Sequence, residues 1–261
     1  MPERQQYEPG TPCWVDISSG DLDATKAFYA ALFGWETFDY PQEEAGGYGM
    51  FLLRGKHVAG YGPTQDEAQP TAWTTYMSVD DADDTAARVE KAGGAVLIPP
   101  MDVFDAGRMA IFADPTGGVF GVWQPRGHIG ADVVNEPSSL TWNELTIRDP
   151  EAGKAFYTEV FGWTAEASAM GGGVEYTVLN LGDRSIGGLL PMGEQFPAEV
   201  PTYWNVYFAV ADCDESAKKV EELGGKVTVP PTTMEGVGRM AVVSGPAGEA
   251  FTLMKNEGPT T

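Results

Sequence analysis

The sequence predicts an α+β protein that contains two copies of one fold. Residues 27–35 (AFYAALFGW) return 128 positions later as residues 155–163 (AFYTEVFGW), and Trp14 returns at the same offset as Trp142. Two further matches lie at an offset of 131, namely Trp73 with Trp204 and Gly107-Arg108-Met109 with Gly238-Arg239-Met240. A period near 130 residues is too long for a solenoid repeat and suits a duplicated domain.

Within the first copy, the order strand, helix and three strands occurs twice. A helix is predicted between Asp21, a suitable N-cap, and Gly34, a suitable C-terminal glycine, because apolar residues recur there at helical spacing. Strands are predicted around this helix at 13–17, 35–40, 48–54 and 57–62. The pattern restarts with a strand at 74–79, a helix at 83–92 and strands near 96–98, 108–113 and 119–124.

The second copy repeats this order. A strand at 140–147 leads to a helix with Asp149 as N-cap, Pro150 at its first position and Gly162 after its end. The remaining elements are strands at 174–181, 185–190 and 205–210, a helix ending at 224–225, and strands at 227–229, 239–244 and 250–255. The chain therefore contains four βαβββ units. We expect domains at 8–126 and 140–257, joined by a linker at 127–139.

Composition restricts the partners. The chain has 38 acidic and 16 basic residues, a net charge of −22, which repels nucleic acid and anionic lipid. Cys13 and Cys213 are not equivalent in the two copies, so no duplicated disulfide framework is expected. Neither an apolar leader nor a long apolar run is present. We expect a cytoplasmic protein, a monomer or homodimer, whose partner is a small molecule.

The repeated motifs resemble the vicinal oxygen chelate superfamily, which includes glyoxalase I, the bleomycin-resistance proteins and the extradiol dioxygenases. The matching stretches are 20–35, 78–82, 93–94 and 114–117 in the first copy, and 149–163, 210–212 and 224–225 in the second. The resemblance covers residues 10 to 256. It implies two tandem glyoxalase-like domains, each of two paired βαβββ units that form a cupped mixed sheet. It does not fix the chemistry, because such folds carry many functions.

In metal-using members, histidine, glutamine or glutamate side chains of four strands hold one divalent ion inside each cup. The matching positions here are Trp14, Thr74, Gly121 and 59–60 in the first copy, and Trp142, Asn205, Thr252 and 187–188 in the second. Tryptophan does not coordinate a hard cation, and none of the others is a strong ligand. We expect no metal site and no cofactor. A metal held instead through Asp16, Glu144 and His57 stays open as an alternative.

Strand alternation sorts the remaining residues into faces. Val15 and Ile17 should pack on the helix, so that Trp14 and Asp16 face the cup. The residues expected in the two cups as a ligand-binding set are Trp14, Thr74, Tyr76, Arg108 and Trp123, and Trp142, Asn205, Tyr207 and Arg239. Aromatic walls with a few polar groups are typical of a small-molecule pocket. The alternative is that Trp14 and Trp142 fill the cups as solid cores.

Asp16 and Glu144 occupy the same place in both copies, and aromatic walls would raise the pKa of each carboxyl group. Each could act as a general base or anchor a ligand ammonium group. The alternatives are that each carboxyl forms a structural ion pair with Arg108 or Arg239, or is simply exposed to solvent. Those arginines could hold a substrate carboxylate or bond carbonyls at the sheet edge.

Two functions follow from this set, and an interaction module with degenerate pockets stays open as a third class. The first is a metal-free protein that binds or sequesters a planar aromatic or cationic ligand in its aromatic cups. The second is a glyoxalase-type lyase or an oxygenase that acts on a small carbonyl or phenolic substrate, with Asp16 or Glu144 as base. The sequence leaves open whether there is turnover.

Overall fold

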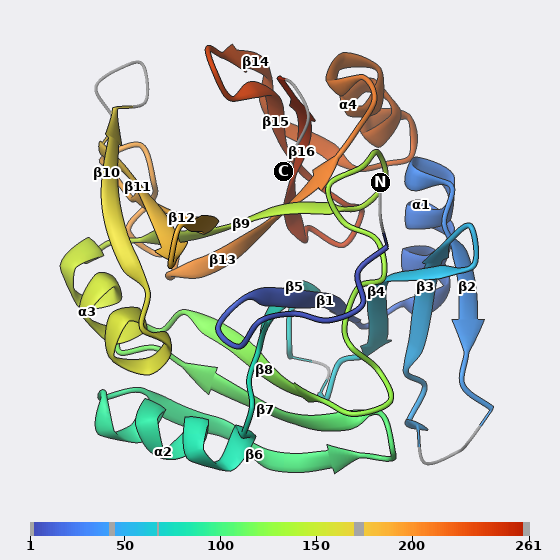
Figure 1. Ribbon diagram of the computed structural model, residues 1–261. Coiled ribbons are helices and arrows are strands. Elements are labelled where there is room, and N and C mark those ends of the chain that lie inside the picture. Colours follow the sequence, from blue (N-terminus) through green and yellow to red (C-terminus); the bar gives the residue numbers. More distant parts are fainter. Residues whose placement is uncertain (1–2, 42–44, 67, 170–174, 258–261) are drawn as a thin grey trace.

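The computed structural model describes residues 3–41, 45–66, 68–169 and 175–257. These residues form two eight-stranded mixed sheets and four helices, so the chain is an α+β protein (Figure 1). The strand order is β2-β3-β4-β1-β5-β8-β7-β6 in the first sheet and β10-β11-β12-β9-β13-β16-β15-β14 in the second. The two orders are the same when each strand is replaced by its counterpart, which confirms the duplication.

The elements of the first copy are β1 (Pro12–Ser19), α1 (Leu22–Phe33), β2 (Glu36–Asp39), β3 (Gly49–Leu53), β4 (Lys56–Pro63), β5 (Ala72–Ser78), α2 (Ala82–Lys91), β6 (Ala95–Val103), β7 (Gly107–Ala113) and β8 (Val119–Pro125). Those of the second are β9 (Leu140–Ile147), α3 (Pro150–Phe161), β10 (Thr164–Ala169), β11 (Glu175–Leu181), β12 (Arg184–Pro191), β13 (Tyr203–Ala209), α4 (Cys213–Glu222), β14 (Lys226–Met234), β15 (Gly238–Ser244) and β16 (Ala250–Asn256). The linker expected at 127–139 lies between β8 and β9.

The predicted helix ends agree with the structure. The carboxylate of Asp21 accepts a hydrogen bond from the backbone N–H of Ala24, and Asp149 does the same for Ala152. Gly34 and Gly162 close these helices in the left-handed conformation, with φ of 74° and 72°. A residue with a Cβ would be strained there, which explains why both copies use glycine.

Three strands differ from the prediction. β6 and β14 continue past the Pro-Pro pairs at which the predicted strands 96–98 and 227–229 end, and their register shifts there at bulges. Proline lacks the N–H that a regular ladder needs, and a bulge accommodates it. β10 was not predicted, because its sequence (TAEASA) has little β propensity. Residue 174, where one strand was expected to begin, lies outside the described residues.

The two copies share their hydrophobic cores. Helix α1 packs against α4, and α2 packs against α3 (Figure 1). One core cluster joins Val15 and Ile17 of the first copy to Phe208 and Leu253 of the second. The sheet faces that carry these residues are thereby buried between the two copies, and the opposite faces carry Asp16 and Glu144.

Buried hydrogen bonds reinforce this contact. The Tyr29 hydroxyl bonds to Glu249 Oε1 at 3.1 Å, and the equivalent Tyr157 hydroxyl bonds to Asp114 Oδ2 at 3.0 Å. None of the helices among the described residues has the length and apolar composition needed to cross a membrane.

Candidate functional site

The floor of the first cup is a carboxyl group held by two tyrosines. Asp16 projects from β1 on the face opposite the core residues Val15 and Ile17, as alternation predicts. Its Oδ2 accepts hydrogen bonds from the hydroxyls of Tyr76 at 3.0 Å and Tyr48 at 3.1 Å. Trp14 Nε1 donates to the Tyr48 oxygen at 3.1 Å. Indole, phenol and carboxyl therefore form one connected network.

The second cup contains the same network on equivalent residues. Glu144 Oε2 accepts a hydrogen bond of 2.8 Å from the hydroxyl of Tyr207. Trp142 Nε1 donates to the hydroxyl oxygen of Tyr176 at 2.9 Å, as Trp14 does to Tyr48. Asp16 and Glu144 are only 8% and 5% exposed. The arrangement therefore occurs twice, on equivalent strands of the two copies.

Burial changes the acidity of both carboxyl groups. It raises the pKa of Asp16 to about 6, although the hydrogen bonds from Tyr76 and Tyr48 lower it in part. Burial likewise raises the pKa of Glu144 to about 7, against the opposing effect of Tyr207 and Tyr176. In the described ranges, neither carboxyl forms an ion pair with lysine or arginine. Each group can therefore exchange a proton close to neutral pH.

Tyr48 and Tyr176 are the site residues that sequence reasoning missed. The two tyrosines are 128 positions apart, Tyr48 just before β3 and Tyr176 near the start of β11. Each lies against a glycine of the neighbouring strand. A Cβ on Gly60 would overlap the Tyr48 hydroxyl, and one on Gly188 would overlap the Tyr176 hydroxyl. A tyrosine repeated at the copy offset together with a glycine repeated at the same offset is the signal that could have found them.

The residues at the family's ligand positions do not fit a divalent cation. At the glycines among these positions tyrosine rings take the place of a ligand side chain, since a Cβ on Gly121 would overlap the ring of Tyr76 just as one on Gly60 or Gly188 would overlap Tyr48 or Tyr176. Among the described residues, no three histidine, cysteine, aspartate or glutamate side chains gather closely enough to bind a metal ion. The alternative trio is not brought together either: Asp16 and Glu144 belong to different sheets, and His57 Nδ1 pairs with Asp132 Oδ2 at 2.9 Å.

The two arginines of the expected site have other partners. Arg108 Nε lies 2.7 Å from Asp83 Oδ2, and Arg239 Nε lies 2.6 Å from Asp214 Oδ2. Each pair joins the start of a strand, β7 or β15, to the first turn of a helix, α2 or α4. Neither arginine contacts Asp16 or Glu144. The ion pairs that would have given these two carboxyl groups a structural role therefore do not form.

The linker covers one end of the first cup. The backbone N–H of Ala131 donates to the Cys13 carbonyl at 2.8 Å, and Trp123 Nε1 donates to the His128 carbonyl at 2.7 Å. The His128 ring meets the Trp14 indole edge-on, at 4.7 Å between ring centres. Trp14 is consequently only 4% exposed and belongs to an apolar cluster, whereas Trp142 keeps partial exposure. The solid-core description therefore suits Trp14 better than Trp142.

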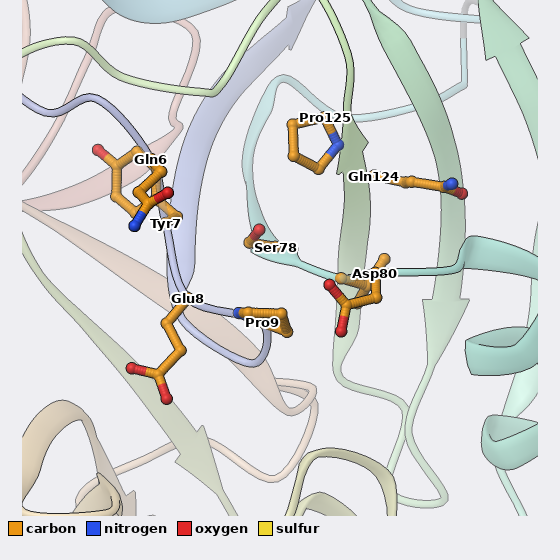
Figure 2. Close-up of a pocket in the computed structure, with 9 residues that line it drawn as sticks. Gln6, Tyr7, Glu8, Pro9, Ser78, Asp80, Gln124 and Pro125 are labelled. Carbon is orange, nitrogen blue, oxygen red and sulfur yellow. The ribbon is translucent and has the colours of Figure 1, made fainter.

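The other expected residues lie on the cup faces. Thr74 is paired with Asp16 in the register of β1 and β5, and Asn205 is paired with Glu144 in that of β9 and β13. A separate cavity of about 500 Å³ lies beside the first cup, between the N-terminal segment and the ends of β5 and β8. Figure 2 shows Gln6, Glu8, Ser78, Asp80 and Gln124 around it. It is polar and contains none of the expected site residues.

Fold and site together define the class of protein. The family model of the Glyoxalase/Bleomycin resistance protein/Dioxygenase superfamily matches residues 13–121 and 139–253, so the chain belongs to this superfamily. It is 43% identical over 259 residues to CFP32 of Mycobacterium bovis, a protein provisionally named a glyoxylase, with 98% of each chain covered. It is 38% identical to the anthracycline biosynthesis protein DnrV of Streptomyces peucetius, covering 96% of this chain and 94% of that one.

Solved structures agree on the fold. The Mn(II)-bound glyoxalase of Novosphingobium aromaticivorans superimposes with a TM-score of 0.62 at 19% identity, covering 97% of this chain and 85% of that one. The 2,2',3-trihydroxybiphenyl 1,2-dioxygenase of Sphingomonas wittichii gives 0.65 at 15% identity, with 95% and 91% covered. At such identities the likeness concerns the fold alone.

Proposed function

We propose that the protein binds a small planar aromatic or cationic molecule in its aromatic-lined cups without using a metal ion. The observation that carries this proposal is the buried carboxyl group under two tyrosines at the floor of each cup, Asp16 with Tyr48 and Tyr76, and Glu144 with Tyr176 and Tyr207. Rings supply flat apolar walls, while the carboxyl supplies one directed polar contact.

The charge of the chain supports the same ligand class. A net charge of −22 favours cations and opposes phosphate backbones and anionic membranes, so we include neither nucleic acid nor membrane among the partners. The relatives named for anthracycline biosynthesis add support, because anthracyclines are fused-ring aromatic compounds. Binding or sequestration of such a compound needs no turnover.

Calorimetric titration of the purified chain against planar aromatic cations tests the proposal. We expect binding of at least one of them in the micromolar range, weakened about tenfold or more when Tyr207→Phe and Glu144→Gln are combined, because a charged or polar contact of this kind contributes on the order of 1.4 kcal/mol or more. The matched control is Glu159→Gln, an exposed glutamate paired with Lys91 outside the cups. Absence of heat for every compound would refute binding.

An enzymatic function is the second candidate, and the pKa of Glu144 favours it. A carboxyl whose pKa lies at about 7 is suited to accept a proton from an acidic C–H or O–H near neutral pH. The relative provisionally named a glyoxylase points in the same direction. Turnover of a small carbonyl or phenolic substrate that disappears in Glu144→Gln and Asp16→Asn, with folding intact, would favour the enzyme over the binding protein.

A further inference from the structure

The two cups share their carboxyl floor but differ in their walls. At six equivalent positions on the cup faces the side chain is more polar in the second copy than in the first. They are Phe38 and Glu166, Tyr40 and Ser168, Leu52 and Asn180, Thr74 and Asn205, Met101 and Thr232, and Gly121 and Thr252. The first wall continues an apolar cluster that includes Met50 and Trp123. The second wall offers hydrogen-bonding groups instead.

Asn205 has an unused acceptor in this second wall. The side chain is 4% exposed and lies on β13 directly opposite Glu144. Its Nδ2 donates to Thr252 Oγ1 at 2.8 Å, while its Oδ1 is buried without a hydrogen-bond partner among the described residues. A buried acceptor without a donor is unfavourable, so a ligand that brings an N–H or O–H group gains by satisfying it.

The surroundings of Asn205 are suited to such a ligand. Trp142, two positions before Glu144 on β9, is partly exposed, whereas its counterpart Trp14 is covered by the linker. Glu166 on β10 and Glu235 in the turn after β14 are exposed where the first copy has Phe38 and Phe104. Exposed negative groups on these two elements and a buried acceptor on β13 both favour a ligand with donor groups.

We propose that the second cup is specific for a ring compound that carries an N–H or O–H donor, an aromatic amine or alcohol, and that Asn205 is its specificity-determining residue. This inference rests on the proposed function and assigns a ligand class to one of the two cups. The ring lies against Trp142 and the donor bonds to Asn205 Oδ1 and Glu144. The first cup, with Thr74 at the equivalent position and an apolar wall, does not make this distinction.

Calorimetry of the full chain with three matched probes tests the inference. Naphthylmethylamine and naphthylmethanol carry an N–H and an O–H donor, and methylnaphthalene carries none. We expect both donors to bind about tenfold more tightly than methylnaphthalene, since a satisfied buried acceptor has an effect of this order. Asn205→Leu keeps the size of the side chain, removes the acceptor and should abolish the preference. Asn205→Asp keeps an acceptor and should retain it.

Two variants complete the design. Glu159→Gln, the exposed control outside the cups, should leave the preference unchanged. Asn205→Thr introduces the first-copy residue and replaces the leucine variant if that variant does not fold. Binding of all three probes with equal affinity, or a preference that survives in Asn205→Leu or Asn205→Thr, would overturn the inference while the proposed binding function stands. Binding of none of the probes would overturn the inference together with that function.

Discussion

Trp35 Nε1 donates a hydrogen bond of 2.8 Å to the backbone carbonyl of Ser138, which fastens the first copy to the turn that precedes the second. The equivalent Trp163 makes the reciprocal bond, also 2.8 Å, to the carbonyl of Gly10. Ser138 and Gly10 both have positive φ, 68° and 86°, so the two acceptors are presented in the same way. The repeated Phe-Gly-Trp motif therefore joins the two copies and does not line a cup.

Replacing Trp35 with phenylalanine should lower the free energy of unfolding by about 2 kcal/mol or more, because the partly buried Ser138 carbonyl loses its donor and a cavity is left. Urea denaturation monitored by circular dichroism measures this loss. Trp142→Phe, at a partly exposed position, is the matched control and should cost clearly less. Equal losses in the two variants would contradict the assignment of Trp35 to the contact between copies.

The glycines beside the cup tyrosines should resist substitution. Gly188→Ala would place a methyl group on the Tyr176 hydroxyl and force the ring away from Trp142 and Glu144. We expect a loss of roughly 1–3 kcal/mol, which is typical of overpacking in a filled interior. Gly20→Ala is the control, because the nearest atom to its new Cβ would be 4.0 Å away. If both alanine variants have the stability of the parent chain, the close packing of Tyr176 is wrong.

The tyrosine hydroxyls should tune the acidity of the carboxyl groups. Because the bond from Tyr207 stabilises the charged form of Glu144, Tyr207→Phe should raise the pKa of this glutamate above its value of about 7. Titration of the side-chain carboxyl carbon by nuclear magnetic resonance follows this shift. Tyr203→Phe, on the same strand but without a hydrogen bond to Glu144, should leave the pKa close to that of the parent. If the pKa of Glu144 fell in the Tyr207→Phe variant, the hydrogen-bond network would be refuted.

The sequence predicted the cup floors because strand alternation is a local property. Once Val15 and Ile17 were placed on the core side, Trp14 and Asp16 had to face the other way, and the same holds for Trp142 and Glu144. The partners of these residues depend on tertiary contacts. Tyr48 precedes β3 and reaches Asp16 only because β4 carries glycine at position 60.

The partners of the two arginines, Arg108 and Arg239, could not be predicted for the same reason. Arg108 opens β7 and was expected near the cup, but helix α2 brings Asp83 to it across 25 positions of chain. Periodicity gives the direction of a side chain relative to its own strand and does not give the helix that packs against it. The shared cores of the two copies were missed for this reason too.

Stability should depend on pH through Glu144. Its folded pKa of about 7 lies above the ordinary value of 4.5, so its contribution is present below about pH 4.5 and is lost as the pH rises through about 7. Between about pH 5 and 8 the parent should lose roughly 2–3 kcal/mol more than Glu144→Gln, which cannot ionise. Urea denaturation at both pH values measures the difference.

Glu159→Gln is the control for this pH dependence. The nearby Lys91 lowers the pKa of Glu159, so its substitution should not remove the loss of stability seen in the parent at high pH. Parallel pH profiles for the parent chain and Glu144→Gln would show that burial does not raise the pKa of this carboxyl.

Divalent metal ions should not stabilise the protein, because the family's ligand positions carry tryptophan, threonine, asparagine and glycine, and tyrosine rings lie against the glycines. A site with a Kd of about 10 μM would, at about 1 mM Mn²⁺ or Ni²⁺, add about 2.7 kcal/mol and raise the melting temperature by a few degrees. We expect a change within about 1 °C in calorimetric scans, and the same small change with Mg²⁺ as the control for loose binding to the acidic surface. A rise of several degrees with Mn²⁺ or Ni²⁺ alone, together with one equivalent of metal retained after dialysis, would show that the cups bind an ion after all.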